Sequence, residues 1–148
     1  TFFGHQGDTM RTAVALLAAL VLPQAHAQER WQEYARSPSG DMAHYYDATK
    51  LVRDQTTFRL PIKVEYKSPV IALNGELVVS SGVMNYEFDC ASKSVRVLSI
   101  EGYTKPNLKG DVSLTSTDLP ESRREHLSRW TSYEDEPHYN RVVSRFCS

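Results

Sequence analysis

The stretch Val83-Met84-Asn85-Tyr86-Glu87-Phe88-Asp89-Cys90 decides the fold of this 148-residue chain. A short polar turn, Ala91 to Ser94, separates it from a second apolar run that extends from Val95 to Tyr103. Two runs rich in β-branched and aromatic residues around a short polar turn are typical of a β-hairpin. A four-residue turn would place Asp89 opposite Arg96, which is a favourable cross-strand pair of charges. The second run has apolar residues on both faces, so we place this hairpin in the middle of a sheet.

A regular alternation upstream predicts a second strand. From Phe58 to Lys67, aromatic or aliphatic residues alternate with charged residues and one proline. A period of two with one apolar face and one polar face indicates a half-buried strand. Pro61 cannot donate a ladder hydrogen bond, so it belongs at an edge or where its nitrogen points away from the neighbouring strand.

Shorter strands surround these two. Residues 31–35 and 42–47 are predicted to form an N-terminal hairpin around a turn rich in Pro, Gly and Ser. The region from Ser68 to Ser81 is either a small hairpin around Asn74-Gly75 or an apolar loop that covers one end of the sheet. The segment from Leu119 to Glu125 is expected to be charged surface, and Trp130 is expected to anchor the chain. One more short strand is predicted at residues 112–114.

The C-terminal residues predict a helix from about Pro137 to Phe146. Three acidic residues, 134–136, lie near its start, and Arg141 and Arg145 lie towards its end, which suits the helix dipole. Tyr139, Val142, Val143 and Phe146 share one face, and Cys147 lies nearly on the same face. The fold class is therefore α+β, with an antiparallel sheet of about six strands and a helix packed on it.

The chain contains two cysteines, Cys90 and Cys147. In an exported protein an even cysteine count predicts a disulfide, and two cysteines allow one intramolecular bond. The alternatives are two free thiols, an intermolecular bond or a metal site, although a metal site usually shows a closely spaced cysteine pair.

The N-terminal residues predict a secretory signal. Met10-Arg11 supplies a short positive start, an apolar run extends from Ala13 to Leu22, and Ala25-His26-Ala27 suits cleavage between Ala27 and Gln28. The run is too short to span a membrane. Residues 1–27 are thus expected to be an upstream extension (1–9) plus the signal, and residues 28–148 the single mature domain. No cysteine follows the cleavage point, so no lipid anchor is expected there.

Composition excludes several functions. The net charge is −1 and 24% of residues are charged, so no basic excess would attract nucleic acid. Glu87 and Asp89 share a strand face and could form an acid–base pair, but a charged edge is the simpler interpretation. His44, His126 and His138 show no metal-binding spacing and are expected on the surface. We therefore predict no catalytic residue, no metal and no cofactor.

Tyrosines and a small basic spot are the candidates for binding. The chain has eight tyrosines, and adjacent Tyr45 and Tyr46 must point to opposite faces of a strand. Exposed tyrosines suit a protein-binding surface, although aromatic residues also favour ordinary sheet packing. Lys93 and Arg96 form a basic spot, which Lys63 and Lys67 would extend if their strand is adjacent; a solvated edge is the alternative.

The order of these features resembles the bacterial surface-adhesin protein E family. The similar segments are Trp31, Tyr45-Tyr46-Asp47, Ile62 to Tyr66, Glu87 to Cys90 with Lys93 in the turn, Arg96-Val97-Leu98, and Trp130 before a terminal helix that ends in Cys147. The resemblance implies an antiparallel sheet whose C-terminal helix is held by a disulfide. It also implies a surface protein that binds host matrix or serum proteins such as vitronectin.

The sequence thus predicts an exported bacterial binding module without catalysis, in the periplasm or at the cell surface. Its partner would be a host extracellular protein, bound through the sheet face or an exposed edge. The alternative is a periplasmic structural or accessory protein with no host ligand. The ligand-binding residues and the oligomeric state are not specified by these patterns.

Overall fold

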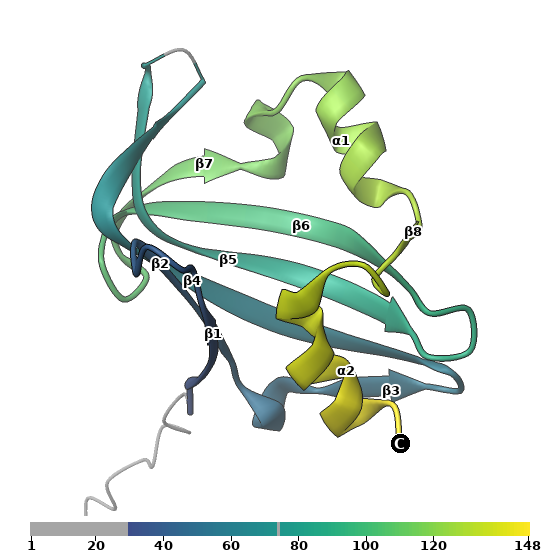
Figure 1. Ribbon diagram of the computed structural model, residues 1–148. Coiled ribbons are helices and arrows are strands. Elements are labelled where there is room, and N and C mark those ends of the chain that lie inside the picture. Colours follow the sequence, from purple (N-terminus) through teal and green to yellow (C-terminus); the bar gives the residue numbers. More distant parts are fainter. Residues whose placement is uncertain (1–29, 74) are drawn as a thin grey trace, which may run out of the picture.

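The computed structural model describes residues 30–73 and 75–148, and it shows one antiparallel sheet with helices on its periphery (Figure 1). The strand order is β1-β2-β4-β5-β6-β7, with β3 also paired to β4 and β8 to β6. The predicted α+β class is confirmed, but the sheet has eight strands rather than about six. The additional strands, β3 (Val52–Asp54) and β8 (Thr131–Ser132), are too short to produce a recognisable alternation.

Three long strands form the centre of the sheet: β4 (Thr57–Ala72), β5 (Leu77–Asp89) and β6 (Ser94–Lys105). The predicted alternating and return strands lie within β4 and β6, and the predicted central strand lies within β5 except for Cys90. The other strands are β1 (Gln32–Arg36), β2 (Met42–Tyr46) and β7 (Lys109–Thr115). The helices are α1 (Glu121–Ser128) and α2 (Asn140–Phe146), and the single turns of 3₁₀ helix are η1 (Ala48–Lys50), η2 (Ser116–Asp118) and η3 (Pro137–Tyr139).

The segment from Ser68 to Ser81 forms the hairpin that was one of its two interpretations. The pairing of β4 with β5 is interrupted after Glu65 and resumes at Val70, and the resulting ribbon projects away from the body of the sheet (Figure 1). Gly75 has a φ of +89°, a conformation that glycine adopts without strain. Asn74, the other predicted turn residue, lies outside the described residues.

The predicted register of the central hairpin is wrong. Asp89 lies opposite Ser94, and Glu87 is the residue that lies opposite Arg96. The strand ends before Cys90, whose amide donates to the carbonyl of Thr56 at 2.9 Å instead of joining the ladder. The turn therefore starts one residue earlier than predicted. It also ends one residue earlier, so each side chain keeps its predicted face.

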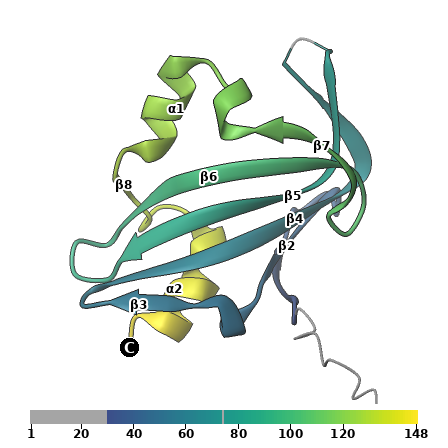
Figure 2. The same cartoon turned by 180° about the vertical axis from the view of Figure 1, so that it is seen from behind.

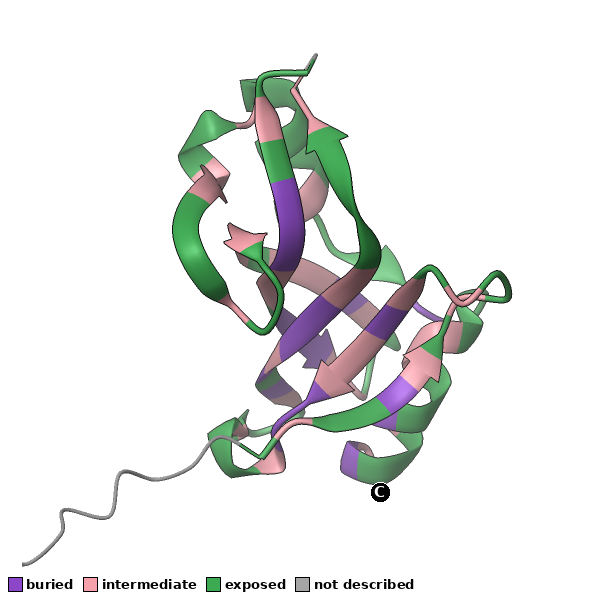
Figure 3. Cartoon of the chain, turned by 90° about the vertical axis from the view of Figure 1, so that its left-hand side faces the viewer, coloured by how far each residue is buried: buried purple, intermediate pink, exposed green. Residues whose placement is uncertain are grey.

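The core lies between α2 and one face of the sheet. Phe58, Leu60, Ile62 and Val64 of β4 are at most 2% exposed, as their alternation predicted. The rings of Phe58 and Phe88 stack at 4.9 Å between centroids, and Phe146 of α2 packs against Phe58 at 5.6 Å. Figure 3 shows that the buried positions recur along the strands, whereas much of the projecting ribbon is exposed. Burying each such side chain stabilises the fold by about 1.5–3 kcal/mol.

Pro61 lies in the centre of the sheet without disrupting it. On one side it pairs with Asn85 of β5. On the other side, β3 pairs with β4 as far as Arg59, and β2 starts to pair at Ile62. Pro61 therefore occupies the gap between two successive neighbours, where β4 requires no donor.

The charged segment around Glu121 lies on the surface, as expected, but its helical conformation is not predicted by the sequence. It forms α1, which begins directly after Pro120 and has no buried residue. Its sequence lacks an apolar stripe, so periodicity could not reveal it. Trp130 is not a buried anchor: it is 40% exposed, and its ring lies 4.6 Å from the guanidinium carbon of Arg96.

Candidate functional site

The sheet has one covered face and one open face. The view from behind shows β4, β5 and β6 running across the front of the molecule, with α2 on the far side (Figure 2). Alternation along β4 points Phe58 and Leu60 towards α2, and therefore points Arg59 and Pro61 away from it. We call this second surface the open face.

Charged side chains form a row across three strands of the open face. The carboxylate of Glu87 on β5 accepts a hydrogen bond from Arg59 Nε on β4 at 2.8 Å and another from Arg96 Nη2 on β6 at 3.0 Å. Glu87 is only 5% exposed, and these two hydrogen bonds satisfy both of its carboxylate oxygens. Arg96 in turn stacks on Trp130. The row carries two cations and one anion, which leaves it positive.

Exposed apolar side chains flank this row. Val52 is 59% exposed and Leu98 42% exposed. The register of β6 against β5 shifts between Asn85 and Tyr86, so that Leu98 is the extra residue of a bulge. A hollow of about 550 Å³ lies between these side chains, over Pro61 and Asn85. A smaller hollow, of about 340 Å³, separates Leu98 from α1.

The predicted basic patch does not form as expected. Lys63 is largely buried, with its Nζ 4.5 Å from the ring centroid of Tyr45, 5.6 Å from that of Trp31 and 3.4 Å from Glu65 Oε1. It therefore fills an aromatic cage and cannot contribute to an exposed cationic surface. Lys93 forms an ion pair with Glu134 at 3.1 Å. Of the four predicted basic residues, only Arg96 belongs to the row on the open face.

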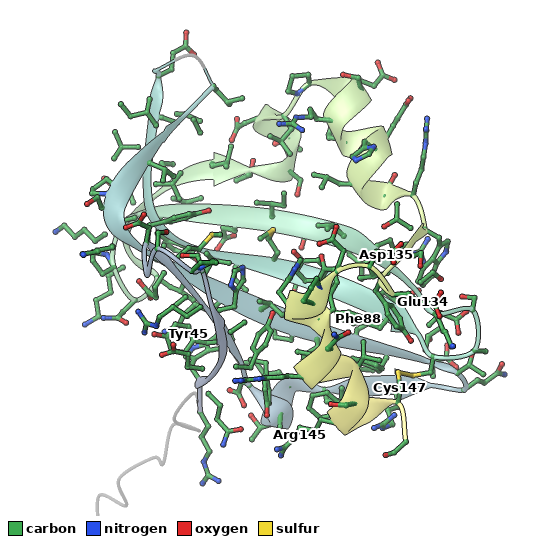
Figure 4. The ribbon with its side chains drawn as sticks, in the orientation of Figure 1. Tyr45, Phe88, Glu134, Asp135, Arg145 and Cys147 are labelled. Atoms are coloured by element: carbon green, nitrogen blue, oxygen red, sulfur yellow. A yellow bond between two sulfur atoms is a disulfide. The ribbon has the colours of Figure 1, made fainter. Side chains whose placement is uncertain are left out.

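The predicted bond between Cys90 and Cys147 is present in the structure. The two Cα atoms are 5.4 Å apart, and the bond joins the end of β5 to the end of α2 (Figure 4). The amide of Tyr133 donates to the carbonyl of Lys93 beside it, at 3.2 Å. The disulfide thus fixes the helix on the covered face, as the inward direction of the predicted helix face required.

Glu87 and Asp89 do not form an acid–base pair. Glu87 is held by two arginines, whereas Asp89 accepts a hydrogen bond from the amide of Ala91 at 3.0 Å. Hydrogen bonds from the Ser92 side chain and from the turn amides lower the pKa of Asp89. Both carboxylates therefore stabilise charged partners or a turn. Within residues 30–73 and 75–148, no three His, Cys, Asp or Glu side chains are grouped so that they could hold a metal ion.

The structure brings together two histidines that were expected on the surface separately. His44 of β2 is half-buried, and its ring stacks with that of His138 of η3 at 5.9 Å between centroids. The two border a groove of about 840 Å³ between the β1–β2 hairpin and the start of α2. No sequence signal joins them, because they lie on separate elements far apart in the chain. His126 is exposed on α1, as predicted.

No helix in the described part of the chain is both long enough and apolar enough to cross a membrane. The predicted signal and its cleavage site, Ala27 and Gln28, lie outside the described residues. No curated protein matches the chain. A family model described as surface-adhesin protein E matches residues 31–148, which is nearly the whole described region.

Proposed function

This chain belongs to the surface-adhesin protein E family, and from that premise we propose that it is an exported module whose open face binds a host extracellular protein. The family supports an adhesin-like role at the cell surface or outside the cell. The observation that carries the location of the site is the row Arg59–Glu87–Arg96–Trp130, which lies on the sheet face opposite α2.

The chemistry of the open face specifies the kind of partner. Tryptophan and arginine are enriched among the residues that contribute most to protein–protein affinity. Here Arg59 lines, with the exposed side chains of Val52 and Leu98, a hollow of about 550 Å³ that can accept an apolar side chain, and Trp130 lies against Arg96 at the other end of the row. The positive charge of the row favours acidic residues around that apolar side chain. We therefore propose an acidic protein surface with an apolar centre as the ligand.

The frame of the site favours binding without rearrangement. Arg59, Glu87 and Arg96 lie on three adjacent strands of the sheet, so backbone ladders hold the charged part of the row, while Trp130 lies between α1 and β8 and contacts Arg96. A rigid site loses little conformational entropy on binding. The disulfide contributes indirectly, because it fixes α2 against the covered face of the same strands.

Binding to immobilised host matrix and serum proteins tests this proposal. We expect Trp130→Ala and Leu98→Ser each to weaken binding by at least about tenfold, the usual loss for a central interface residue. Ile71→Ser is the matched control, since Ile71 is apolar and 70% exposed but lies on the projecting ribbon. Equal losses in all three variants, or none in the first two, would place binding elsewhere.

The cellular location separates this role from that of a periplasmic structural or accessory protein. Treatment of intact cells with a protease should degrade a displayed adhesin and leave a periplasmic protein intact. Full protection of the mature chain, with degradation only after the outer membrane is permeabilised, would favour the second role.

A further inference from the structure

The helix α2 is attached to the sheet in different ways at its two ends. Its C-terminal end is bonded covalently through Cys147 to Cys90. Its N-terminal end follows η3, where His138 stacks on His44 of β2 with an angle of 30° between the ring planes. Arg141, in the first turn of α2, donates from Nη1 to the carbonyl of Tyr34 at 2.9 Å. Only the contact between the two histidines can change its charge near neutral pH.

The surroundings of the two rings favour their neutral forms. His44 Nδ1 is buried and has no hydrogen-bond partner among the described residues. Within the described part of the chain, the carboxylate in contact with the pair is that of Glu136, whose Oε2 lies 3.5 Å from His138 Nδ1. The other ionisable groups near the pair are Glu33, Tyr34 and Arg36 of β1, Tyr139 of η3 and Arg141 of α2. On β4, the residue paired with His44 is Val64, which does not ionise.

We propose that the contact between His44 and His138 is a proton-sensitive latch, which holds η3 and the first turn of α2 on β2 at neutral pH and releases them in mildly acidic medium. The disulfide retains the other end of the helix in both states. This latch is independent of the binding role proposed for the open face, because it lies at the covered face.

The sign of the effect follows from proton linkage. Burial lowers the pKa of both histidines, and the nearby His138 lowers that of His44 further, whereas Glu136 partly restores that of His138. In the released state each ring regains a pKa near its ordinary value of 6.5. The released state then binds more protons, so falling pH favours it by up to about tenfold per pH unit for each histidine below that value.

Charge repulsion between the two protonated rings is one cause of this lowering of the pKa, and its size can be worked out from their separation. Two unit charges roughly 6 Å apart at an effective dielectric constant of about 20 repel by an energy equivalent to about 100-fold in an equilibrium constant. The His138 side chain is 38% exposed, so solvent screens part of this repulsion. The neighbouring Arg141 carries a charge of the same sign. We therefore expect release to become ten- to 100-fold more favourable between about pH 7.5 and 5.

Release would widen the groove of about 840 Å³ that both histidines border. The groove wall includes Tyr34, Met42 and Pro137, so acidification would expose apolar surface that is covered at neutral pH. Because Cys147 stays bonded to Cys90, the helix would pivot about its C-terminal end and close again when the pH rises.

Hydrogen exchange of the disulfide-bonded chain at pH 7.5 and pH 5.0, corrected for intrinsic rates, tests the latch. The protection factors of the α2 amides should fall about ten- to 100-fold at pH 5.0, while those of Tyr86 and Phe88 in β5 stay constant. A variant with His44→Phe and His138→Phe keeps two stacked rings without a titrating group, so it should show no such fall. His126→Gln, on the exposed helix α1, is the matched control and should behave like the wild type.

Two results would overturn the proposal. One is equal α2 protection at both pH values in the wild type, and the other is the same fall in the double phenylalanine variant. If that variant does not fold, the ring resonances of wild-type His44 and His138 can be titrated by NMR. Midpoints below 6.5 support the latch, and midpoints at or above 6.5 contradict it.

Discussion

Reduction of the Cys90–Cys147 disulfide should destabilise the protein by about 4 kcal/mol. The two cysteines are 57 residues apart in the sequence, and the entropy of closing a loop of that length in the unfolded chain corresponds to about 4 kcal/mol at 25 °C. The bond also holds α2, whose Val142 and Phe146 cover the rings of the sheet. We therefore expect the reduced protein to lose hydrogen-exchange protection first in α2 and only later in β4 and β5.

Urea unfolding of the same preparation, oxidised and reduced, measures the global effect. With a slope of roughly 2 kcal/mol per M, a loss of about 4 kcal/mol lowers the unfolding midpoint by about 2 M. A variant with Cys90→Ala and Cys147→Ala should match the reduced wild type, which separates the bond from any effect of the reductant. A midpoint shift of less than about 0.5 M, or protection lost equally in α2 and the central strands, would refute the reasoning. Mapping by mass spectrometry without reduction must also find the two cysteines in one linked peptide.

Three further predictions concern the sheet. Glu87→Gln should lower the free energy of unfolding by about 1–3 kcal/mol, because it leaves the guanidinium groups of Arg59 and Arg96 without their carboxylate. Glu125→Gln, at an exposed position, is the control in urea unfolding. Equal losses of stability in the two variants would contradict the account. Burial raises the pKa of Tyr86 above its ordinary value of 10.0, so the unfolded state loses this proton first and stability falls as pH rises above about 10. Tyr86→Phe should therefore move the alkaline unfolding midpoint to higher pH, and an unchanged midpoint in circular dichroism would exclude this cause. Gly102→Ala should lower the free energy of unfolding by about 1–3 kcal/mol through overpacking, since its new Cβ would lie 3.1 Å from Leu114 Cβ and 3.2 Å from both Val79 methyl groups. A thermal unfolding midpoint equal to that of the wild type would contradict this prediction, because it would show that these neighbours can move.

Local sequence patterns predicted which faces of β4 and of the C-terminal helix are buried. The alternation from Phe58 to Tyr66 gave the buried face of β4, because side chains in a strand alternate by geometry alone. The spacing of Val142 and Phe146 gave the inward face of the C-terminal helix. The same face directed Cys147 towards the sheet, where the structure places its bond to Cys90.

Features that depend on tertiary contacts could not be predicted in the same way. The hairpin register depends on where Cys90 leaves the ladder to donate to Thr56, and residue types do not specify that contact. The alternating pattern predicts Lys63 as an exposed cation on the polar face of its strand, but residues from two other segments, Trp31 and Tyr45, cover it. The contact of His44 with His138 arises only when η3 packs on β2. The row on the open face could not be predicted for a related reason: the predicted hairpin register pairs Arg96 with Asp89, whereas the structure pairs it with Glu87.

The most direct test of the central claim is the affinity of purified residues 28–148 for host matrix and serum proteins, measured beside that of an open-face variant. The account predicts that a variant with Leu98→Ser and Trp130→Ala loses binding at least about 100-fold, while it unfolds in urea close to the wild-type midpoint and Ile71→Ser binds normally. A stably folded double variant that binds as tightly as the wild type would contradict the claim that the open face is the binding surface.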